Sequence, residues 1–279
     1  MIIVKNKLRL SACLSETARS EKNIGFVPTM GALHAGHISL IKKSIADNNL
    51  SVCSIFINPA QFNNITDLEK YPVTIEKDID MLENAGCDVL FLPSVDEMYP
   101  VQEMPVHYEL GSLENILEGK YRPGHFQGVC RIVDKLLNAV KPNVMYLGRK
   151  DYQQCLIIRK MMFERKHGAT LRICDTVREA DGLAMSSRNM RLNVDERLQA
   201  TKIIESLKMM KVGLKPGDLS QIKKEATLFL ENNGYKVDYT EIADADTLEI
   251  QKKWDGSKKT VALAAAYLNE VRLIDNIVL

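Results

Sequence analysis

The sequence has no long apolar run that could cross a membrane. No stretch approaches the roughly 18 uninterrupted apolar residues of a membrane-spanning helix. The apolar run at the start, Met1 to Val4, is too short for the core of a secretory signal peptide. We therefore expect a cytoplasmic protein with no membrane partner.

Paired cysteine motifs and an excess of either charge are also missing. The six cysteines include no CxxC pair, so free thiols that are buried or half-buried, in a reducing compartment, are the favoured interpretation. Lysine and arginine number 37 against 36 for aspartate and glutamate, a net charge of +1. General nucleic-acid binders usually carry a basic excess. We therefore expect no nucleic-acid partner, although a local basic pocket for a phosphorylated ligand is compatible with this balance.

Short apolar segments rich in β-branched residues recur through the first two-thirds of the chain. They are continuous rather than alternating, as expected for strands that are buried on both faces of a sheet. We predict strands over residues 24–27, 51–57, 88–92, 143–147 and 170–174.

Helical patterns separate these strands. Residues 125–140 repeat apolar side chains at helical spacing and end before Pro142. Residues 38–46 and 75–85 show a similar pattern, and Gly86 closes the second of them. Strands that alternate with helices predict an α/β fold, a parallel sheet with helices on both faces. Ligands bind such sheets beyond the C-terminal ends of the strands.

The pattern changes near residue 180. The 279 residues are compatible with one large or two medium domains. We predict a larger domain over 1–178 and a smaller α+β domain over 179–279. In the second domain we predict helices over 194–212 and 217–232 and strands near 236–243, 260–268 and 270–275.

The segment 28–37 reads PTMGALHAGH and joins the first predicted strand to a helix. A helix start attracts anions, and Gly31 and Gly36 let a ligand approach the backbone. His34 and His37 are spaced so that both can face one phosphate. A structural histidine pair is one alternative, and a metal site is another, although no third ligand has a suitable spacing. The HxGH element resembles the phosphate signature of nucleotidylyl transferases and of Rossmann-like tRNA synthetases.

The segment 185–188, Met-Ser-Ser-Arg, offers two hydroxyls and a guanidinium that suit a triphosphate. It resembles the KMSKS-type loop of the same synthetases, with Ser187-Arg188 in place of the lysine. A polar turn at the end of the first domain is the alternative.

The segment 148–154 follows another predicted strand and starts a helix. Lys150 can neutralise a transferring phosphoryl group, and Asp151 can accept hydrogen bonds from ribose hydroxyls. The alternative is a helix start with a solvated charge pair.

Amide side chains suit the recognition of a small acid. Asn58 and Gln61 come directly after a predicted strand, and Gln154 lies one helical turn after Lys150. Amides can orient a carboxylate and hydroxyl groups because they both donate and accept hydrogen bonds. Ordinary loop amides are the alternative.

Taken together, the motifs resemble the pantothenate synthetase family over nearly the whole chain. They occur in the order PTMGALHAGH, NPAQF, RPGHF, KDYQQ, DGLAMSSRN and LIDN. The resemblance implies that pantoate and ATP form pantoyl-adenylate and pyrophosphate with Mg²⁺, and that β-alanine then gives pantothenate and AMP. It also implies a homodimer, a Rossmann-like N-terminal domain and a smaller C-terminal lid domain.

The resemblance also implies roles for single residues. His37 is expected as a proton donor, with His34 and Lys150 as further catalytic groups, and Gln61 and Gln154 should hold pantoate with Asn58 nearby. No protein metal site is expected, because phosphate oxygens and water should hold most of the Mg²⁺ shell. ATP should be bound by Met30, Gly31, Ala32, Leu33, His34, Ala35, Gly36, His37, Gly148, Arg149, Lys150, Asp151, Val177, Met185, Ser186, Ser187 and Arg188.

One departure from the family and one loop bear on how the site closes. The family often has arginine after Tyr71-Pro72, whereas Val73 stands here, so a secondary contact to ligand or lid is expected to be missing. The polar run 63–67 is a candidate lid segment that would keep water from the adenylate, with an ordinary surface loop as the alternative.

Three other functions share parts of the pattern. Another HxGH nucleotidylyl transferase acting on a small substrate would use the same phosphate signature but gives no reason for Gln61 and Gln154. A non-catalytic nucleotide-binding module would not need Lys150 or Gln154. A truncated tRNA synthetase is disfavoured because the chain has no recognisable anticodon-binding region and no basic excess.

Overall fold

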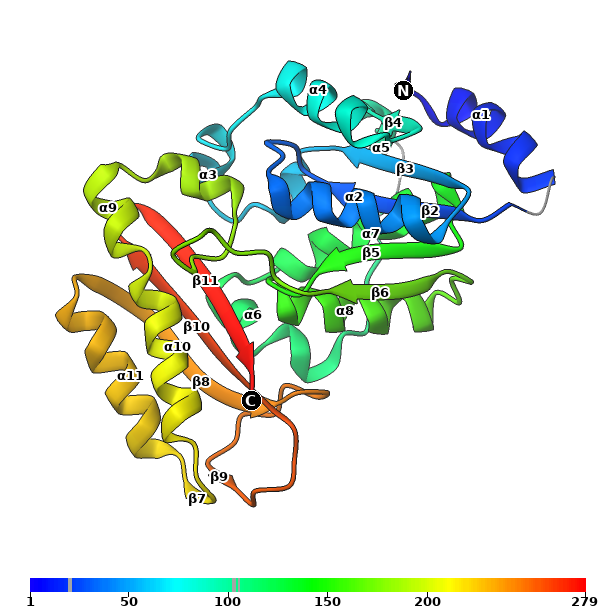
Figure 1. The fold of residues 1–279 in the computed structure, drawn as a ribbon. Coiled ribbons are helices and arrows are strands. Elements are labelled where there is room, and N and C mark those ends of the chain that lie inside the picture. The colour runs from blue at the N-terminus through cyan, green and yellow to red at the C-terminus, as the bar shows by residue number, and fades with distance from the viewer. Residues whose placement is uncertain (20–21, 102–103, 105) are drawn as a thin grey trace.

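Residues 1–19, 22–101, 104 and 106–279 are described by a computed structural model. Figure 1 shows two neighbouring units, one coloured blue to green around a first sheet and one coloured yellow to red around a second. Among the described helices, none is both long and apolar enough to span a bilayer.

The larger sheet has six parallel strands in the order β1-β4-β3-β2-β5-β6. The five predicted strands are confirmed, with ends shifted by at most two residues. The first strand, which pairs Ile2 with Val89, was missed because three residues are too few to show a pattern. The strands are β1 (Ile2–Val4), β2 (Ile24–Thr29), β3 (Leu50–Ile55), β4 (Val89–Phe91), β5 (Val144–Gly148) and β6 (Thr170–Cys174).

The strand order reverses at the centre of this sheet. β2 lies between β3 and β5, and its pairing with β5 aligns Gly25 with Val144. Successive connections therefore leave the sheet in opposite directions on the two sides of this pair. In open parallel sheets such a point leaves a crevice at the C-terminal strand ends. The loops after β2 and β5 flank that crevice.

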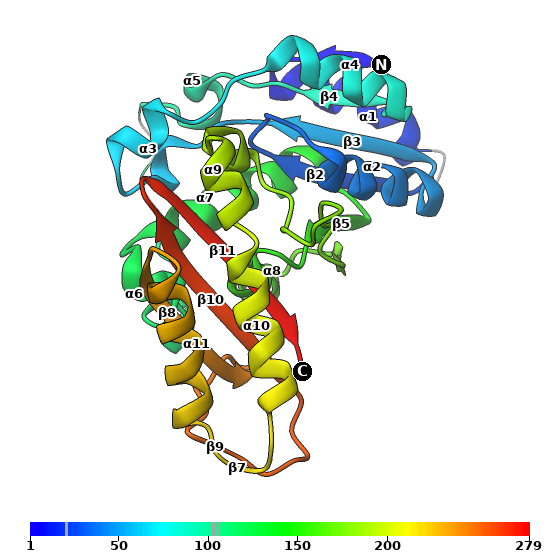
Figure 2. The same cartoon turned by 60° about the vertical axis from the view of Figure 1, so that its left-hand side comes forward.

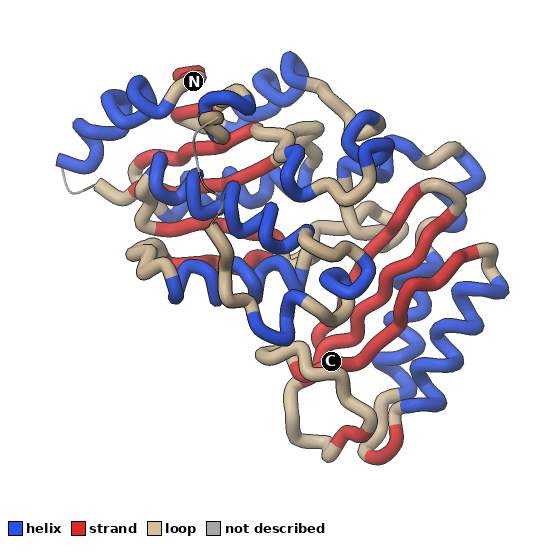
Figure 3. The backbone as a smooth tube through the Cα atoms, turned by 180° about the vertical axis from the view of Figure 1, so that it is seen from behind, coloured by secondary structure: helices blue, strands red, loops and turns tan. Residues whose placement is uncertain are grey.

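Helices cover both faces of the larger sheet, as predicted, and Figure 3 shows the strands enclosed between them. One face carries α2 (Ala35–Asp47) and α4 (Ile75–Ala85), and the other carries α1 (Lys7–Arg19), α7 (His125–Val140) and α8 (Tyr152–Glu164). The predicted ends of α4 and α7 are confirmed. Shorter helices lie in the connections: α3 (Ile65–Glu69), α5 (Val95–Met98) and α6 (Glu118–Tyr121).

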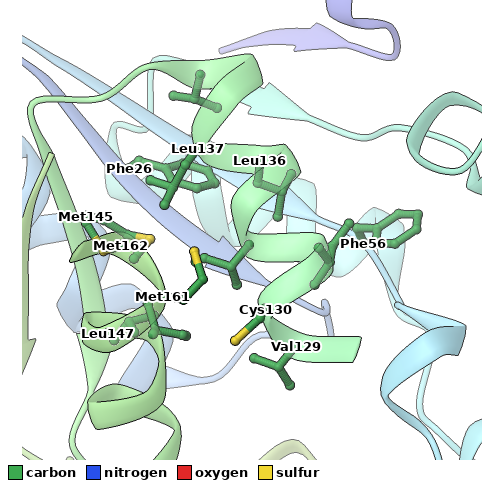
Figure 4. Packing of buried hydrophobic residues seen from close by; sticks show 14 of the residues in the cluster. Phe26, Phe56, Val129, Cys130, Leu136, Leu137, Met145, Leu147, Met161 and Met162 are labelled. Atoms are coloured by element: carbon green, nitrogen blue, oxygen red, sulfur yellow. The ribbon is translucent and has the colours of Figure 1, made fainter. Parts of the chain in front are cut away.

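Successive strand residues feed two separate hydrophobic cores. In β2, Phe26 packs with the α7 and α8 core, whereas Val27 packs with the α2 and α4 core. This follows from the two-residue period of a strand. Figure 4 shows Leu136 and Leu137 of α7 packed near Phe26 and Met145. Each such buried side chain contributes roughly 1.5–3 kcal/mol of transfer free energy.

The second unit is a three-stranded antiparallel sheet in the order β11-β10-β8, which confirms the α+β prediction. Figure 2 shows α10 and α11 side by side along one face of it. Its elements are α10 (Lys202–Gly213), α11 (Ser220–Asn232), β8 (Tyr235–Asp244), β10 (Thr260–Leu268) and β11 (Val271–Val278).

Two predicted helices in this unit have different limits. The helix predicted over 194–212 is divided into α9 (Val194–Gln199) and α10. The helix predicted over 217–232 begins only at Ser220, because Gly217, with φ 127°, starts the short strand β7 (Gly217–Asp218). That strand pairs with β9 (Lys253–Trp254).

The two units share an apolar contact. Leu117 and Leu156 of the first unit pack with Ala243 and Leu263 of the second unit's sheet. Leu117 has φ 46° and ψ −121°, a backbone conformation that leucine rarely adopts. This strained residue directly precedes α6, which lies against the second unit. The division between residues 178 and 179 stays a prediction.

Candidate active site

The loop after β2 is held by a buried carboxylate. Asp78 of α4 is fully buried and accepts the backbone N–H groups of Ala32 at 2.9 Å and Leu33 at 2.8 Å. Gly31 has φ 80°, and a Cβ there would come within 3.1 Å of the Asp78 carboxylate. Glycine is therefore required at this turn. The N–H groups of Ala32 and Leu33 bind Asp78 and are not free for a phosphate.

His34 and His37 cap the start of α2 with their rings together. The His34 Nδ1 accepts from the Gly36 N–H at 3.2 Å, and the His37 Nδ1 accepts from the His34 N–H at 3.3 Å. The ring centroids are 4.0 Å apart. Because a backbone N–H can only donate, both Nδ1 atoms act as acceptors. This network assigns the proton of each neutral ring to Nε2.

Burial keeps these two rings uncharged. Burial and the nearby Lys150 lower the pKa of His34 to about 4. Burial, followed by repulsion from a protonated His34 and by the Lys150 cation, holds the pKa of His37 well below its usual value. Both histidines are therefore neutral Nε2–H donors at neutral pH.

The loop after β5 presents Lys150 and is held from the second unit. Asn276 of β11 donates from Nδ2 to the carbonyls of Arg149 at 3.1 Å and Lys150 at 2.8 Å. The Lys150 side chain is 17 % exposed, with its Nζ 3.6 Å from the Asp151 carboxylate. The Arg149 side chain instead pairs with Asp175 at 2.5 Å. The C-terminal strand thus fixes the backbone that carries Lys150.

The segment 185–188 joins the histidine loop to α3. The Ser187 hydroxyl donates to the Ala32 carbonyl at 2.9 Å. The Arg188 Nη2 lies 3.0 Å from the Asp67 carboxylate, which also pairs with Arg191 at 2.8 Å. Burial opposes charge on Arg188, but its bond to Asp67 raises the pKa of the guanidinium. Arg188 therefore stays cationic.

Two of the three predicted amides face the crevice. Gln61 and Gln154 both line it. Asn58 is 1 % exposed and lies outside the lining residues in the described part of the chain. Its Nδ2 donates to the Gln61 Oε1 at 3.1 Å and to the Gly128 carbonyl at 3.0 Å, and its Oδ1 accepts from the Tyr99 hydroxyl at 2.7 Å. Asn58 therefore sets the orientation of Gln61 without lining the cavity, and its predicted place near pantoate stays a prediction.

These segments converge on one cavity of about 240 Å³. An adjoining cavity of about 450 Å³ shares Glu118, Arg122, Lys150, Asp151 and Arg188 with it and extends toward α3. The predicted residues that line the first cavity are Met30, His34, Gly36, His37, Gln61, Gly148, Lys150, Asp151, Gln154, Val177, Met185, Ser186, Ser187 and Arg188.

Some predicted ATP residues support this cavity without lining it. Arg149 is among them, because its side chain pairs with Asp175, and the rest are Gly31, Ala32, Leu33 and Ala35. Val73 is 65 % exposed and does not line either cavity within the described ranges.

A buried charge cluster in the wall was not predicted. Glu118 of α6 accepts from Arg272 at 2.7 and 2.8 Å and from the Tyr239 hydroxyl at 2.8 Å. Burial opposes its ionisation, but the bonds from Arg272 lower the pKa of Glu118 to about 2. Asp78 was also missed. No motif in the sequence marks either carboxylate, because each one acts on residues that lie far away along the chain.

The chain matches known proteins over nearly all of its residues. The model of the family described as Pantoate-beta-alanine ligase matches residues 2–278. A pantothenate synthetase of Bacteroides thetaiotaomicron is 43 % identical over 96 % of this chain and 95 % of its own length. One of Cytophaga hutchinsonii is 42 % identical over 100 % of this chain and 99 % of its own.

Solved structures agree in fold. The crystal structure of pantothenate synthetase from Thermus thermophilus has a TM-score of 0.91 and 37 % identity, covering 99 % of each chain. A pantoate-beta-alanine ligase from Francisella tularensis, complexed with beta-gamma ATP and beta-alanine, has a TM-score of 0.81 and 38 % identity. That alignment covers 100 % of this chain and 97 % of the other.

Proposed function

Because the chain belongs to the pantoate–β-alanine ligase family, we propose that the cavity beyond the C-terminal ends of β2 and β5 makes and shelters a pantoyl-adenylate. The chain is an ATP-dependent ligase that joins pantoate to β-alanine and forms pantothenate. The single observation that carries the proposed route is the convergence of His34, His37, Lys150 and Arg188 with Gln61 and Gln154 on one cavity.

The proposed route has two displacements. A pantoate carboxylate oxygen attacks the α-phosphorus of ATP, forming an O–P bond as the bond to pyrophosphate breaks. The neutral amine of β-alanine then attacks the acyl carbon, forming the C–N bond. The C–O bond to AMP breaks, and the amine nitrogen loses one proton. The protein supplies position and charge stabilisation rather than covalent chemistry.

The roles divide between two groups of lining residues. The Nε2–H groups of His34 and His37 suit phosphate oxygens, and the Lys150 and Arg188 cations suit the charge that develops on the leaving pyrophosphate. The expected proton-donor role of His37 uses this Nε2–H.

In the second group, Gln61 and Gln154 suit the carboxylate and hydroxyls of pantoate. The apolar side chains of Phe126, Val129 and Val133 line the same cavity and suit the two methyl groups of pantoate.

Magnesium fits this site as part of its nucleotide. Within the described ranges, no group of three or more histidine, cysteine, aspartate or glutamate side chains is placed to hold a metal ion. Asp151 lines the cavity and fits one oxygen ligand at most. Phosphate oxygens and water would supply the other ligands, and the ion would neutralise phosphate charge. The homodimer and the cytoplasmic location are proposed on the resemblance of the motifs.

Oxygen-18 in the carboxylate of pantoate tests the adenylate directly. Attack on the α-phosphorus leaves one labelled oxygen on AMP when the amide forms, so mass spectrometry of AMP should show one label per turnover. Activation of pantoate at the γ-phosphate would put the label in inorganic phosphate instead. Unlabelled AMP would contradict the proposed intermediate.

A further inference from the structure

Two residues of the RPGHF segment 122–126, Arg122 and His125, have no role in the steps assigned so far. The segment joins α6 to α7, and both Arg122 and His125 line the first cavity. Arg122 also lines the second cavity. The two side chains bind the same backbone atom, the carbonyl of Gln61. They therefore stand beside the residue that we propose to hold pantoate.

Most N–H donors of the Arg122 guanidinium have no hydrogen-bond partner among the described residues. Its Nη2 donates to the Gln61 carbonyl at 3.4 Å, the single hydrogen bond of this guanidinium to any described residue. Its Nη1 is 3.9 Å from the Glu118 carboxylate, beyond hydrogen-bond distance, and Glu118 is already bound by Arg272 and Tyr239. Arginine carries five N–H donors. Most of those on Arg122 are thus left for a ligand.

Arg122 also keeps its charge. Burial, only partly offset by Glu118, lowers its pKa to about 10, so the guanidinium is protonated at neutral pH. Glu118 balances this positive charge only in part, and the Arg122 side chain lines both cavities.

The ring nitrogens of His125 have the opposite donor and acceptor roles from those of His34 and His37. It is 5 % exposed, and its Nδ1 lies 2.8 Å from the Gln61 carbonyl, which can only accept. Burial and the Arg122 charge lower the pKa of His125 to about 3, so the ring is neutral with its proton on Nδ1. Its Nε2 is then a bare acceptor, without a partner among the residues described. His125 lines the cavity, and a free acceptor on a lining residue suits an N–H group and is unsuited to a phosphate oxygen.

We propose that Arg122 and His125 form the subsite for β-alanine, in which Arg122 binds the carboxylate and the His125 Nε2 accepts a hydrogen bond from the amine. A cation and an acceptor side by side match a short amino acid, which carries a carboxylate and an amine two methylenes apart. Because both side chains bind the Gln61 carbonyl, they lie beside the proposed position of the acyl group. The inference rests on the proposed function and names the residues that receive its second substrate.

Hydroxylamine separates this subsite from the adenylation site. It traps an acyl-adenylate as a hydroxamate and has no carboxylate for Arg122 to bind. In Arg122→Gln we expect kcat/KM for β-alanine to fall about 10- to 100-fold, as for a lost charge-assisted bond. Hydroxamate formation and pantoate-dependent exchange of pyrophosphate into ATP should change by less than about threefold. Arg122→Lys, which keeps the charge, should recover part of the β-alanine rate.

Two further variants sharpen the test. Lys120→Gln removes an exposed cation two residues away and should alter none of the three rates. His125→Asn keeps an amide N–H near the Nδ1 position and deletes the Nε2 acceptor. It should lower kcat/KM for β-alanine with little change in hydroxamate formation.

The outcomes are distinct. An unchanged kcat/KM for β-alanine in Arg122→Gln would overturn the subsite. So would an equal loss in pyrophosphate exchange, which would assign Arg122 to pyrophosphate, pantoate or the fold. Absence of exchange in the unaltered enzyme would instead remove the proposed adenylate, whatever Arg122 does.

Discussion

Lys150 is the residue on which the proposed phosphate site most depends. Its side chain is largely buried, its backbone is fixed by Asn276, and it lines both cavities. Replacing it with alanine removes a preorganised cation from the leaving pyrophosphate. Comparable losses cost about 2.7–4 kcal/mol in the transition state.

We therefore expect Lys150→Ala to lower pantoate-dependent pyrophosphate exchange about 100- to 1000-fold. Lys42→Ala is a matched control, since Lys42 is exposed on α2. A loss below about threefold in Lys150→Ala would remove this lysine from the chemistry.

The buried histidines make the free energy of unfolding depend on pH. The folded pKa values of His34 and His125 are about 4 and about 3, below the ordinary value of 6.5. Between the folded and the unfolded pKa values, the unfolded chain binds more protons than the folded protein. The stability that these neutral histidines contribute is therefore fully present above pH 6.5 and is lost as the pH falls below it.

Each such histidine should lower the free energy of unfolding by about 2 kcal/mol when the pH falls from 7 to 5. Urea unfolding at the two pH values, without ligands, measures this. The His125→Asn variant should lose about 2 kcal/mol less than the unaltered protein over that interval. An identical loss in both proteins would show that His125 does not titrate as described.

At the residue scale, sequence reasoning finds the groups that face ligands better than the groups that hold them. His34, Lys150 and Gln154 lie in motifs next to strand ends, and the parallel sheet brings such ends together. Asp78 carries no motif, because it contacts residues 45 and 46 positions away. Asn58 looks like a ligand residue in sequence because nothing there shows that Tyr99 and Gly128 occupy its polar atoms.

At the element scale, α3 connects the candidate lid, residues 63–67, to the second unit. Asp67 pairs with Arg188 and Arg191, and Lys70 pairs with Glu270 at 2.6 Å. Figures 1 and 2 both place α3 near α9 and the start of β11. These pairs hold the segment in the wall of the second cavity, where it would keep water from the adenylate.

Asp67→Ala should loosen this cover and let water compete with β-alanine. We expect the ratio of AMP to pantothenate, equal to one in a coupled enzyme, to rise by about twofold or more. Glu69→Ala changes an exposed carboxylate on the same helix and should leave the ratio at one. A ratio that stays at one in Asp67→Ala would exclude a sealing role for α3.

Long elements with a clear period were predictable, and short ones were not. α7 and α4 have the predicted ends because their apolar faces pack against the sheet. β1 and β7 have three and two residues, and pairing with distant strands determines them.

At the scale of the whole molecule, side chains of the second unit bind residues around the site and hold them in position. Arg178 forms two bonds to Asp275, Asn276 holds the Lys150 loop, and Arg272 binds Glu118. The partners in these contacts are 97 to 154 residues apart, so no local pattern shows them. The sequence predicts the two units, and only the structure shows how the second one is attached.

The pantoate-dependent exchange of labelled pyrophosphate into ATP, without β-alanine, tests most directly whether the converging loops form one adenylating site. The cavity predicts steady exchange when pantoate, ATP and Mg²⁺ are all present, and none when pantoate is left out. Exchange that is absent with all three, or that continues without pantoate, would contradict the account.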